Sequence, residues 1–238
     1  MKTLRNNVSH LVTVVLMLLG MMTAATAHAQ AAPQQLTASR TICSFNPIPA
    51  GWVITSSYNT YCPGSGVEYT ITDTSGRTYL EVCSFSPKPE GWVVTSSYSS
   101  MNCAGSGVAY GLTNAANRTY IDVCSFSPIP TGWVVSSSIS SINCAGSGVS
   151  YGISNVTNRT SAEVCSLSPI PAGWVVTQGY SINNCAGTGV AYSISNVTNR
   201  TYADVCSYSP IPAGWSITRS YNTTSCAGTS IAYSIHKG

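Results

Sequence analysis

Ten cysteines carry the clearest chemical signal in this sequence. They form two series, one spaced 40 or 41 residues apart and the other spaced 41. The first series is Cys43, Cys83, Cys124, Cys165 and Cys206, and the second is Cys62, Cys103, Cys144, Cys185 and Cys226. Zinc would need a different pattern, because no Cys-x-x-Cys pair occurs and His236 is the single histidine after residue 29. An even set of cysteines in an exported chain predicts disulfide bonds, with no metal and no other cofactor.

Two regular disulfide pairings fit this spacing. In the first, each cysteine of the first series bonds to the next one along the chain, as in Cys43–Cys62, and closes a loop of about 20 residues. In the second, bonds such as Cys62–Cys83 link successive repeats, and Cys43–Cys226 closes the chain into a ring. The first pairing is favoured, because it needs no long-range loop closure and each bond restricts the unfolded chain locally.

Acidic residues recur once in each of the last four repeats, four residues after an arginine. The acids are Glu81, Asp122, Glu163 and Asp204, and the arginines are Arg77, Arg118, Arg159 and Arg200. We interpret them as ion pairs between adjacent repeats. A glycoside hydrolase needs two carboxylates at one site, and His236 lies where a general base would be poorly oriented. The sequence therefore predicts that the chain is not an enzyme.

All five tryptophans fall in phase with the cysteines. They are the candidate ligand-binding residues Trp52, Trp92, Trp133, Trp174 and Trp215. One interpretation places each indole in a small core beside a disulfide, and this one is favoured. The other makes each ring a platform for a sugar, with avidity from five weak sites. The variable, hydroxyl-rich segments 97–102 and 179–184 are further candidates for ligand contact.

Each repeat contains three strand signals and no helical period. In the second repeat these are residues 91–95 and the alternating Val108, Tyr110 and Leu112, and a third signal leads into the next repeat at 118–126. The Pro-x-Pro step before each tryptophan cannot enter a central strand, because proline has no N–H to donate. We therefore expect an all-β fold of about fifteen strands, in a linear array of five disulfide-linked units of about 41 residues. The alternative is a closed, propeller-like ring of five blades.

The first 29 residues have the features of a signal peptide. Lys2 and Arg5 precede an apolar run at 11–22, and Ala27-His28-Ala29 forms a small-x-small cleavage site. Residues 30–39 are expected to be an unstructured leader. The predicted repeats are repeat 1 (40–76), repeat 2 (77–117), repeat 3 (118–158), repeat 4 (159–199) and repeat 5 (200–238).

Charged residues make up only 7% of the chain, and loss of Lys2 and Arg5 with the signal peptide lowers the formal net charge from +3 to +1. The absence of a basic patch argues against nucleic acid as a partner, and no later segment is apolar enough for membrane insertion. We expect a secreted or periplasmic, non-catalytic, lectin-like adhesion protein. It would bind neutral glycans or a cell surface through repeated weak sites. The alternative is a surface-coat or matrix component that self-associates without a small ligand.

Overall fold

The computed structural model describes residues 38–60, 62–64 and 66–238, and all regular elements in these ranges are β-strands. The first strand of each unit has five residues: β1 (Ser39–Cys43), β4 (Tyr79–Cys83), β7 (Tyr120–Cys124), β10 (Ser161–Cys165) and β13 (Tyr202–Cys206). The second has eight: β2 (Trp52–Asn59), β5 (Trp92–Ser99), β8 (Trp133–Ser140), β11 (Trp174–Ser181) and β14 (Trp215–Asn222). The third has seven: β3 (Val67–Asp73), β6 (Val108–Asn114), β9 (Val149–Asn155), β12 (Val190–Asn196) and β15 (Ile231–Lys237). The predicted all-β fold is confirmed, and none of the described residues belongs to a helix that could cross a membrane.

Each unit folds into one antiparallel sheet with its third strand in the middle. In unit 2 the order is β4-β6-β5, with Cys83 opposite Ala109 and Trp92 opposite Asn114. The register shifts between Val94 and Ser96, so β5 carries a bulge, and the second strand of every other unit has its bulge at the same place. A bulge increases the local twist and leaves one residue outside the ladder. Strand β1 begins at Ser39, the last residue of the predicted leader, while the predicted signal peptide lies outside the described residues.

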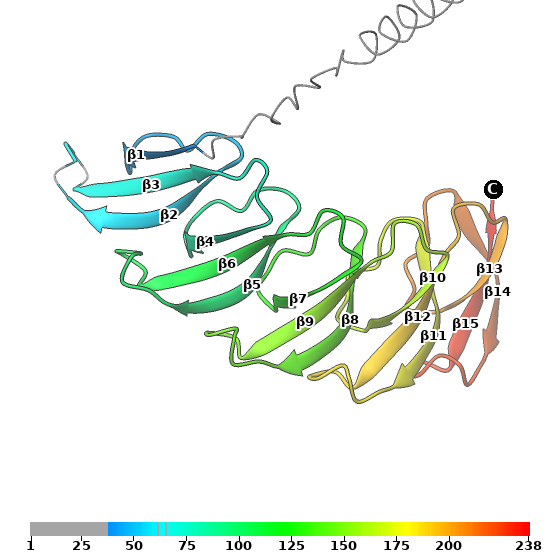
Figure 1. Cartoon of the computed structure of the whole chain (residues 1–238). Helices are drawn as coiled ribbons and strands as arrows, with labels where there is room; N and C mark the ends of the chain where they lie inside the picture. The colour runs from blue at the N-terminus through cyan, green and yellow to red at the C-terminus, as the bar shows by residue number, and fades with distance from the viewer. Residues whose placement is uncertain (1–37, 61, 65) are drawn as a thin grey trace, which may run out of the picture. The chain divides into compact units, whose positions relative to one another are not determined.

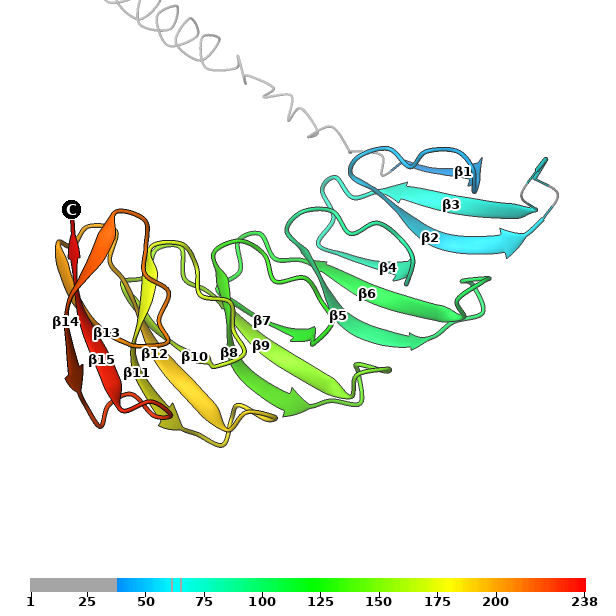
Figure 2. The ribbon, with the colours of Figure 1, turned by 180° about the vertical axis from the view of Figure 1, so that it is seen from behind.

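The five sheets form a linear array. They follow one another in chain order, from the blue strands of unit 1 to the red strands of unit 5 (Figures 1 and 2). The second strand of each sheet packs against the first strand of the next, as β2 does with β4 and β5 with β7. Within the described part of the chain, no strand of unit 1 contacts a strand of unit 5. The expected linear arrangement is therefore confirmed, and the alternative closed ring is not formed.

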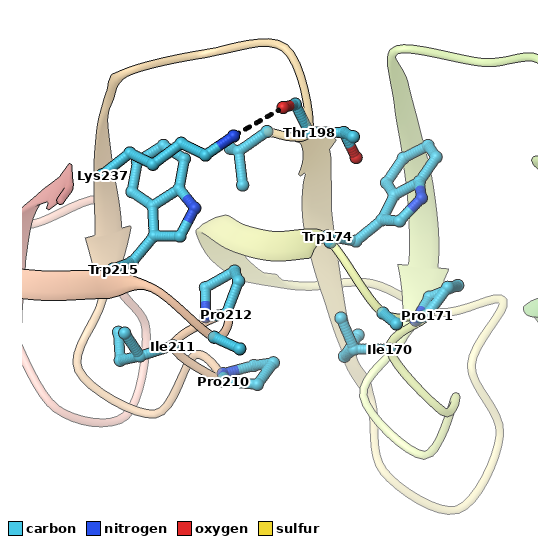
Figure 3. Close-up of a pocket in the computed structure, with 13 residues that line it drawn as sticks. Ile170, Pro171, Trp174, Thr198, Pro210, Ile211, Pro212, Trp215 and Lys237 are labelled. Carbon is cyan, nitrogen blue, oxygen red and sulfur yellow. Dashed lines mark hydrogen bonds between the residues drawn. The ribbon is translucent and has the colours of Figure 1, made fainter.

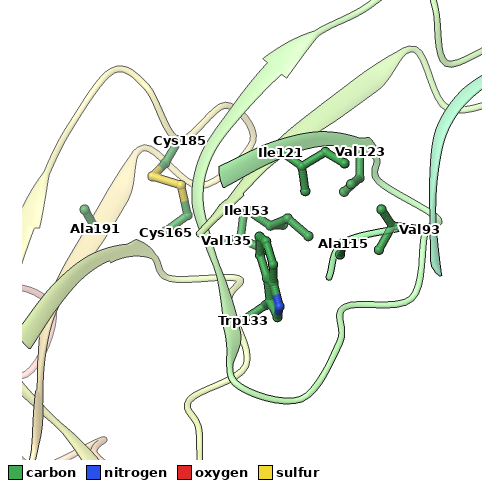
Figure 4. Close-up of a cluster of buried hydrophobic side chains, with 10 residues drawn as sticks. All are labelled: Val93, Ala115, Ile121, Val123, Trp133, Val135, Ile153, Cys165, Cys185 and Ala191. Carbon is green, nitrogen blue, oxygen red and sulfur yellow. A yellow bond between two sulfur atoms is a disulfide. The ribbon is translucent and has the colours of Figure 1, made fainter. Parts of the chain in front are cut away.

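Consecutive units share their hydrophobic cores. The cluster in Figure 4 surrounds Trp133 and Ile153 of unit 3, but it also contains Val93 from unit 2 and Ala191 from unit 4. The other clusters likewise combine residues of neighbouring units, as Val53 of unit 1 joins Leu80 of unit 2. A unit of this size rarely encloses a sufficient core alone. Here the next unit completes it.

The disulfides follow the pairing within units. The bonds are Cys43–Cys62, Cys83–Cys103, Cys124–Cys144, Cys165–Cys185 and Cys206–Cys226. The alternative pairing, with its Cys43–Cys226 closure, is therefore wrong. None of the cysteines in the described residues is free. Five disulfides are typical of a protein that folds in an oxidising, extracellular environment.

Candidate functional site: the grooves between units

A repeated turn sets the direction of each tryptophan. In unit 2 the Trp92 N–H donates to the Pro89 carbonyl at 3.1 Å, and Gly91 adopts a positive φ of 77°. This geometry corresponds to a β-turn whose third residue must tolerate the left-handed region, which explains the fixed glycine before tryptophan. The same N–H to carbonyl bond occurs in the other four units. Each turn therefore places a proline, and three residues later a tryptophan, at the start of the second strand.

Grooves open where the turns of consecutive units face each other. The groove between units 4 and 5 has a volume of about 460 Å³, and Trp174, Trp215 and the prolines of both turns line it (Figure 3). Lys237 on β15 is the cross-strand neighbour of Trp215 on β14 and lies beside it. The Lys237 Nζ donates to the Thr198 carbonyl at 3.5 Å. Apart from this amine and Thr198, the side chains that line the groove, such as Ile170, are apolar.

Equivalent grooves lie at the two preceding boundaries. The groove between units 2 and 3 measures about 600 Å³, and the groove between units 3 and 4 about 170 Å³. The former has a polar rim, because Lys88 and Glu90 replace the isoleucine and alanine found in unit 4 at Ile170 and Ala172. The three grooves thus share a proline and tryptophan frame but differ at the rim.

The lining of these three grooves includes four of the candidate tryptophans, Trp92, Trp133, Trp174 and Trp215, but not Trp52. Trp92, Trp133 and Trp174 expose only 4, 6 and 4% of their surface, as the core interpretation expects. Trp52 and Trp215, in the first and last units, are partly exposed. A ligand in a groove would therefore touch ring edges and proline rings rather than an open indole face.

The residue between the two prolines of each unit carried no prediction, and in units 2 to 5 it lines a groove. In unit 2 it is Lys88. In units 1, 3, 4 and 5 it is isoleucine: Ile48, Ile129, Ile170 and Ile211. Ile129, Ile170 and Ile211 pack against a core cluster and line a groove. The recurrence of isoleucine between the two prolines in four of the five units is the signal that could have identified this position.

Tyrosines, rather than the predicted arginines, are the partners of the aspartates. The Tyr120 hydroxyl donates to Asp122 at 2.7 Å, and the Tyr202 hydroxyl donates to Asp204 at 2.6 Å. Burial opposes ionisation of Asp204, but hydrogen bonds from Tyr202, Ser234 and Tyr221 outweigh it and hold the pKa of Asp204 below its usual value. Each site holds a single carboxylate that is already hydrogen-bonded.

The predicted contact segments before the second cysteine are shorter than expected. Ser97 is 4% exposed and belongs to β5, so only the tip of segment 97–102 is a loop. At these tips Met101 and Ile142 are 99 and 98% exposed, and Ile142 borders a shallow hollow of about 450 Å³. Each tip lies at the far end of an eight-residue strand from the groove, about 24 Å away. The grooves and the tips are therefore separate candidate surfaces.

No three His, Cys, Asp or Glu side chains gather as metal ligands among the residues that the structure describes. His236 lies on β15, where its ring meets Tyr202 edge-on at 5.0 Å. Gly105 and Gly107, in the turn before β6, have positive φ values of 98° and 64°, which glycine tolerates.

No protein-family profile matches the chain, and no curated protein sequence or solved structure is significantly similar to it.

Proposed function

We propose that this chain is an exported, non-catalytic binding protein that engages neutral glycans, at a cell or matrix surface, through the grooves between its units. The recurrence of a proline and tryptophan groove at three consecutive boundaries is the observation that carries the proposal. A regular series of similar grooves suits a ligand that is itself a repeating polymer.

The composition of the grooves favours an uncharged ligand. The groove between units 4 and 5 has one charged side chain, Lys237, and the groove between units 2 and 3 pairs one cation, Lys88, with one anion, Glu90. The charges of the second groove balance, and the single amine of the first is too little charge to select an ionic polymer. Proline and indole edges offer apolar contact to the C–H faces of sugar rings, while backbone groups and Asn or Thr side chains offer hydrogen bonds.

Several shallow sites along one chain suit weak individual binding. A groove in which the indole is almost fully buried offers little apolar contact area, so each contact contributes modestly. When one polymer occupies neighbouring grooves, the second contact forms at a raised effective concentration. The overall affinity then depends on the number of units.

Retention on immobilised neutral polysaccharides tests the proposal. We expect the wild-type chain to bind at least one class of neutral glycan, with little dependence on salt because the ligand is uncharged. The double variant Ala172→Arg/Ala213→Arg places long side chains at exposed rim positions of the groove between units 4 and 5. We expect it to lower the affinity by about tenfold, which corresponds to about 1.4 kcal/mol.

A matched pair of substitutions separates the grooves from the loop tips. Asn183→Arg/Thr224→Arg adds the same charge at exposed tip positions of the same two units. These variants should bind as the wild type does. Loss of binding in the tip variants with retention in the groove variants would move the site to the tips. A chain that no neutral glycan retains, and that assembles as its concentration rises, would favour the coat function instead.

A further inference from the structure

Three kinds of contact join each pair of consecutive units. A buried valine of one unit meets an aliphatic side chain of the next, as Val53 meets Leu80 and Val93 meets Ile121. A serine hydroxyl of the following unit accepts a hydrogen bond from a backbone N–H of the second strand, as Ser86 Oγ accepts from the Ile54 N–H at 2.8 Å. All four boundaries have this serine bond.

The third contact is a pair of backbone bonds to the disulfide loop of the following unit. The Ser57 N–H donates to the Asn102 carbonyl at 2.8 Å, and the Ala104 N–H donates to the Ser57 carbonyl at 3.1 Å. The equivalent pair occurs at the other three boundaries, where it forms a short parallel bridge. We call the surface of a unit that contacts the preceding unit its leading face, and its second strand its trailing edge.

Unit 1 lacks each of these groups on its leading face. Arg40 stands where the later units have Leu80, Ile121, Ala162 and Ala203, and Asn46 stands where they have the accepting serine. Pro63 replaces the alanine whose N–H donates to the preceding unit, and proline has no N–H. Arg40 is exposed and lies over the Trp52 ring at 4.9 Å.

The trailing edge of unit 5 also differs in sequence from the trailing edges of units 1 to 4. Ser216 replaces the valine that is fully buried in the other four units, and it is exposed. Arg219 replaces a serine or glutamine on the same strand, and charged side chains on an edge strand oppose pairing with another strand. Both outer surfaces therefore differ from the internal boundaries at the contact positions themselves.

We infer that the leading face of unit 1 and the trailing edge of unit 5 are caps that prevent a second copy of this chain from adding head to tail. Docking of two copies would bring Arg40 toward Ser216, where an internal boundary has apolar contact, and would lack the serine acceptor and the alanine donor. Repeat arrays need polar outer surfaces of this kind to remain soluble. A head-to-tail contact that repeats without closing would otherwise build a filament.

The inference is tested in the full-length chain by replacing the cap residues with those found at the internal boundaries. The leading-face variant combines Arg40→Leu and Asn46→Ser with replacement of residues 59–66 by the unit 2 segment 99–107, which restores the alanine and the missing residue. The trailing-edge variant combines Ser216→Val and Arg219→Ser. Sedimentation velocity should find the wild type free of head-to-tail oligomers, while the chain with both caps reversed forms oligomers that lengthen with concentration.

The two single-ended variants provide the decisive control. Each restores one matching surface, so each alone should remain monomeric, and an equimolar mixture should form a one-to-one dimer that grows no further. Thiol titration and circular dichroism establish that the variants are folded. Crosslinks between unit 1 and unit 5 of different wild-type copies would overturn the inference. So would a monomeric mixture of folded single-ended variants, because the contacts described would then not suffice for docking.

Discussion

Strands β2 and β14 have nearly the same sequence and very different surroundings. Their eight residues differ only at Val53, which is Ser216 in β14, and at Ser56, which is Arg219. Both strands pair with the central strand of their sheet through the same bulged register. Yet Ile54 is 2% exposed and its counterpart Ile217 is 50% exposed.

The difference between the two strands arises from the neighbouring unit. Unit 2 covers β2 with a core cluster that contains Cys83, Cys103 and Ala109, whereas no other unit covers β14 within the described residues. The sheet of one unit is therefore half of a core, and the next unit supplies the other half. Stability should consequently be coupled between nearest neighbours, as in other stacked repeats.

We expect the largest difference in stability when the equivalent isoleucines of the two strands, Ile54 and Ile217, are each replaced by alanine. Ile54→Ala removes three buried carbons and leaves a cavity between units 1 and 2, so we expect a loss of about 2–5 kcal/mol in the free energy of unfolding. Ile217→Ala acts on a half-exposed side chain, and its cost should be about 1 kcal/mol or less. Chemical denaturation with the disulfides intact measures both values. Equal losses would show that cover by the next unit does not determine stability.

A second contrast concerns the serine that joins units. Ser86 is 3% exposed and its hydroxyl accepts from the Ile54 N–H and donates to the Pro87 carbonyl at 3.2 Å. Ser86→Ala leaves a buried N–H without its acceptor, so we expect a loss of about 1–3 kcal/mol. Asn46→Ala, at the equivalent position of unit 1, removes an exposed side chain and should change stability by at most about 0.5 kcal/mol. The same denaturation experiment compares them, and a large effect of Asn46→Ala would contradict its role as a cap.

Much of the fold could be predicted from local sequence. The constant phase of cysteine and tryptophan defines the unit, and alternation at Val108, Tyr110 and Leu112 predicts the central strand. The pairing within units followed from the short loop, although the shared cores show that a unit does not complete its own interior.

The features that sequence could not predict depend on how one unit meets the next. The partner of Asp122 was expected to be arginine, but the neighbouring Tyr120 on the same strand reaches it. The grooves form only when two Pro-x-Gly-Trp turns face each other, and no single repeat encodes that distance. Arg40 and Pro63 are visible departures from the repeat, but their meaning requires the contacts at the internal boundaries.

The smallest effect on stability is expected from Tyr98, a residue of unit 2 that packs over β2. Tyr98 packs against the cluster of Ile54 and Ile71. Burial, followed by a hydrogen bond to Glu81 and the charge of that carboxylate, raises the pKa of Tyr98 from 10.0 to about 12. The equivalent Tyr58 of unit 1 is 43% exposed, and the position of Glu81 is occupied there by Thr41.

This shift predicts a dependence of stability on alkaline pH. Because the folded state holds the Tyr98 proton more tightly than the unfolded chain, its contribution is fully present below pH 10.0 and is lost as the pH rises through about 12. Tyr98→Phe should remove that part of the alkaline decrease in the free energy of unfolding. It should also remove one late-titrating phenol from the ultraviolet absorbance curve. Glu81→Gln should lower the Tyr98 pKa only in part, since burial is the larger cause. A Tyr98 that ionises near 10.0 in the folded wild type would mean that unit 2 covers β2 less closely than the structure describes.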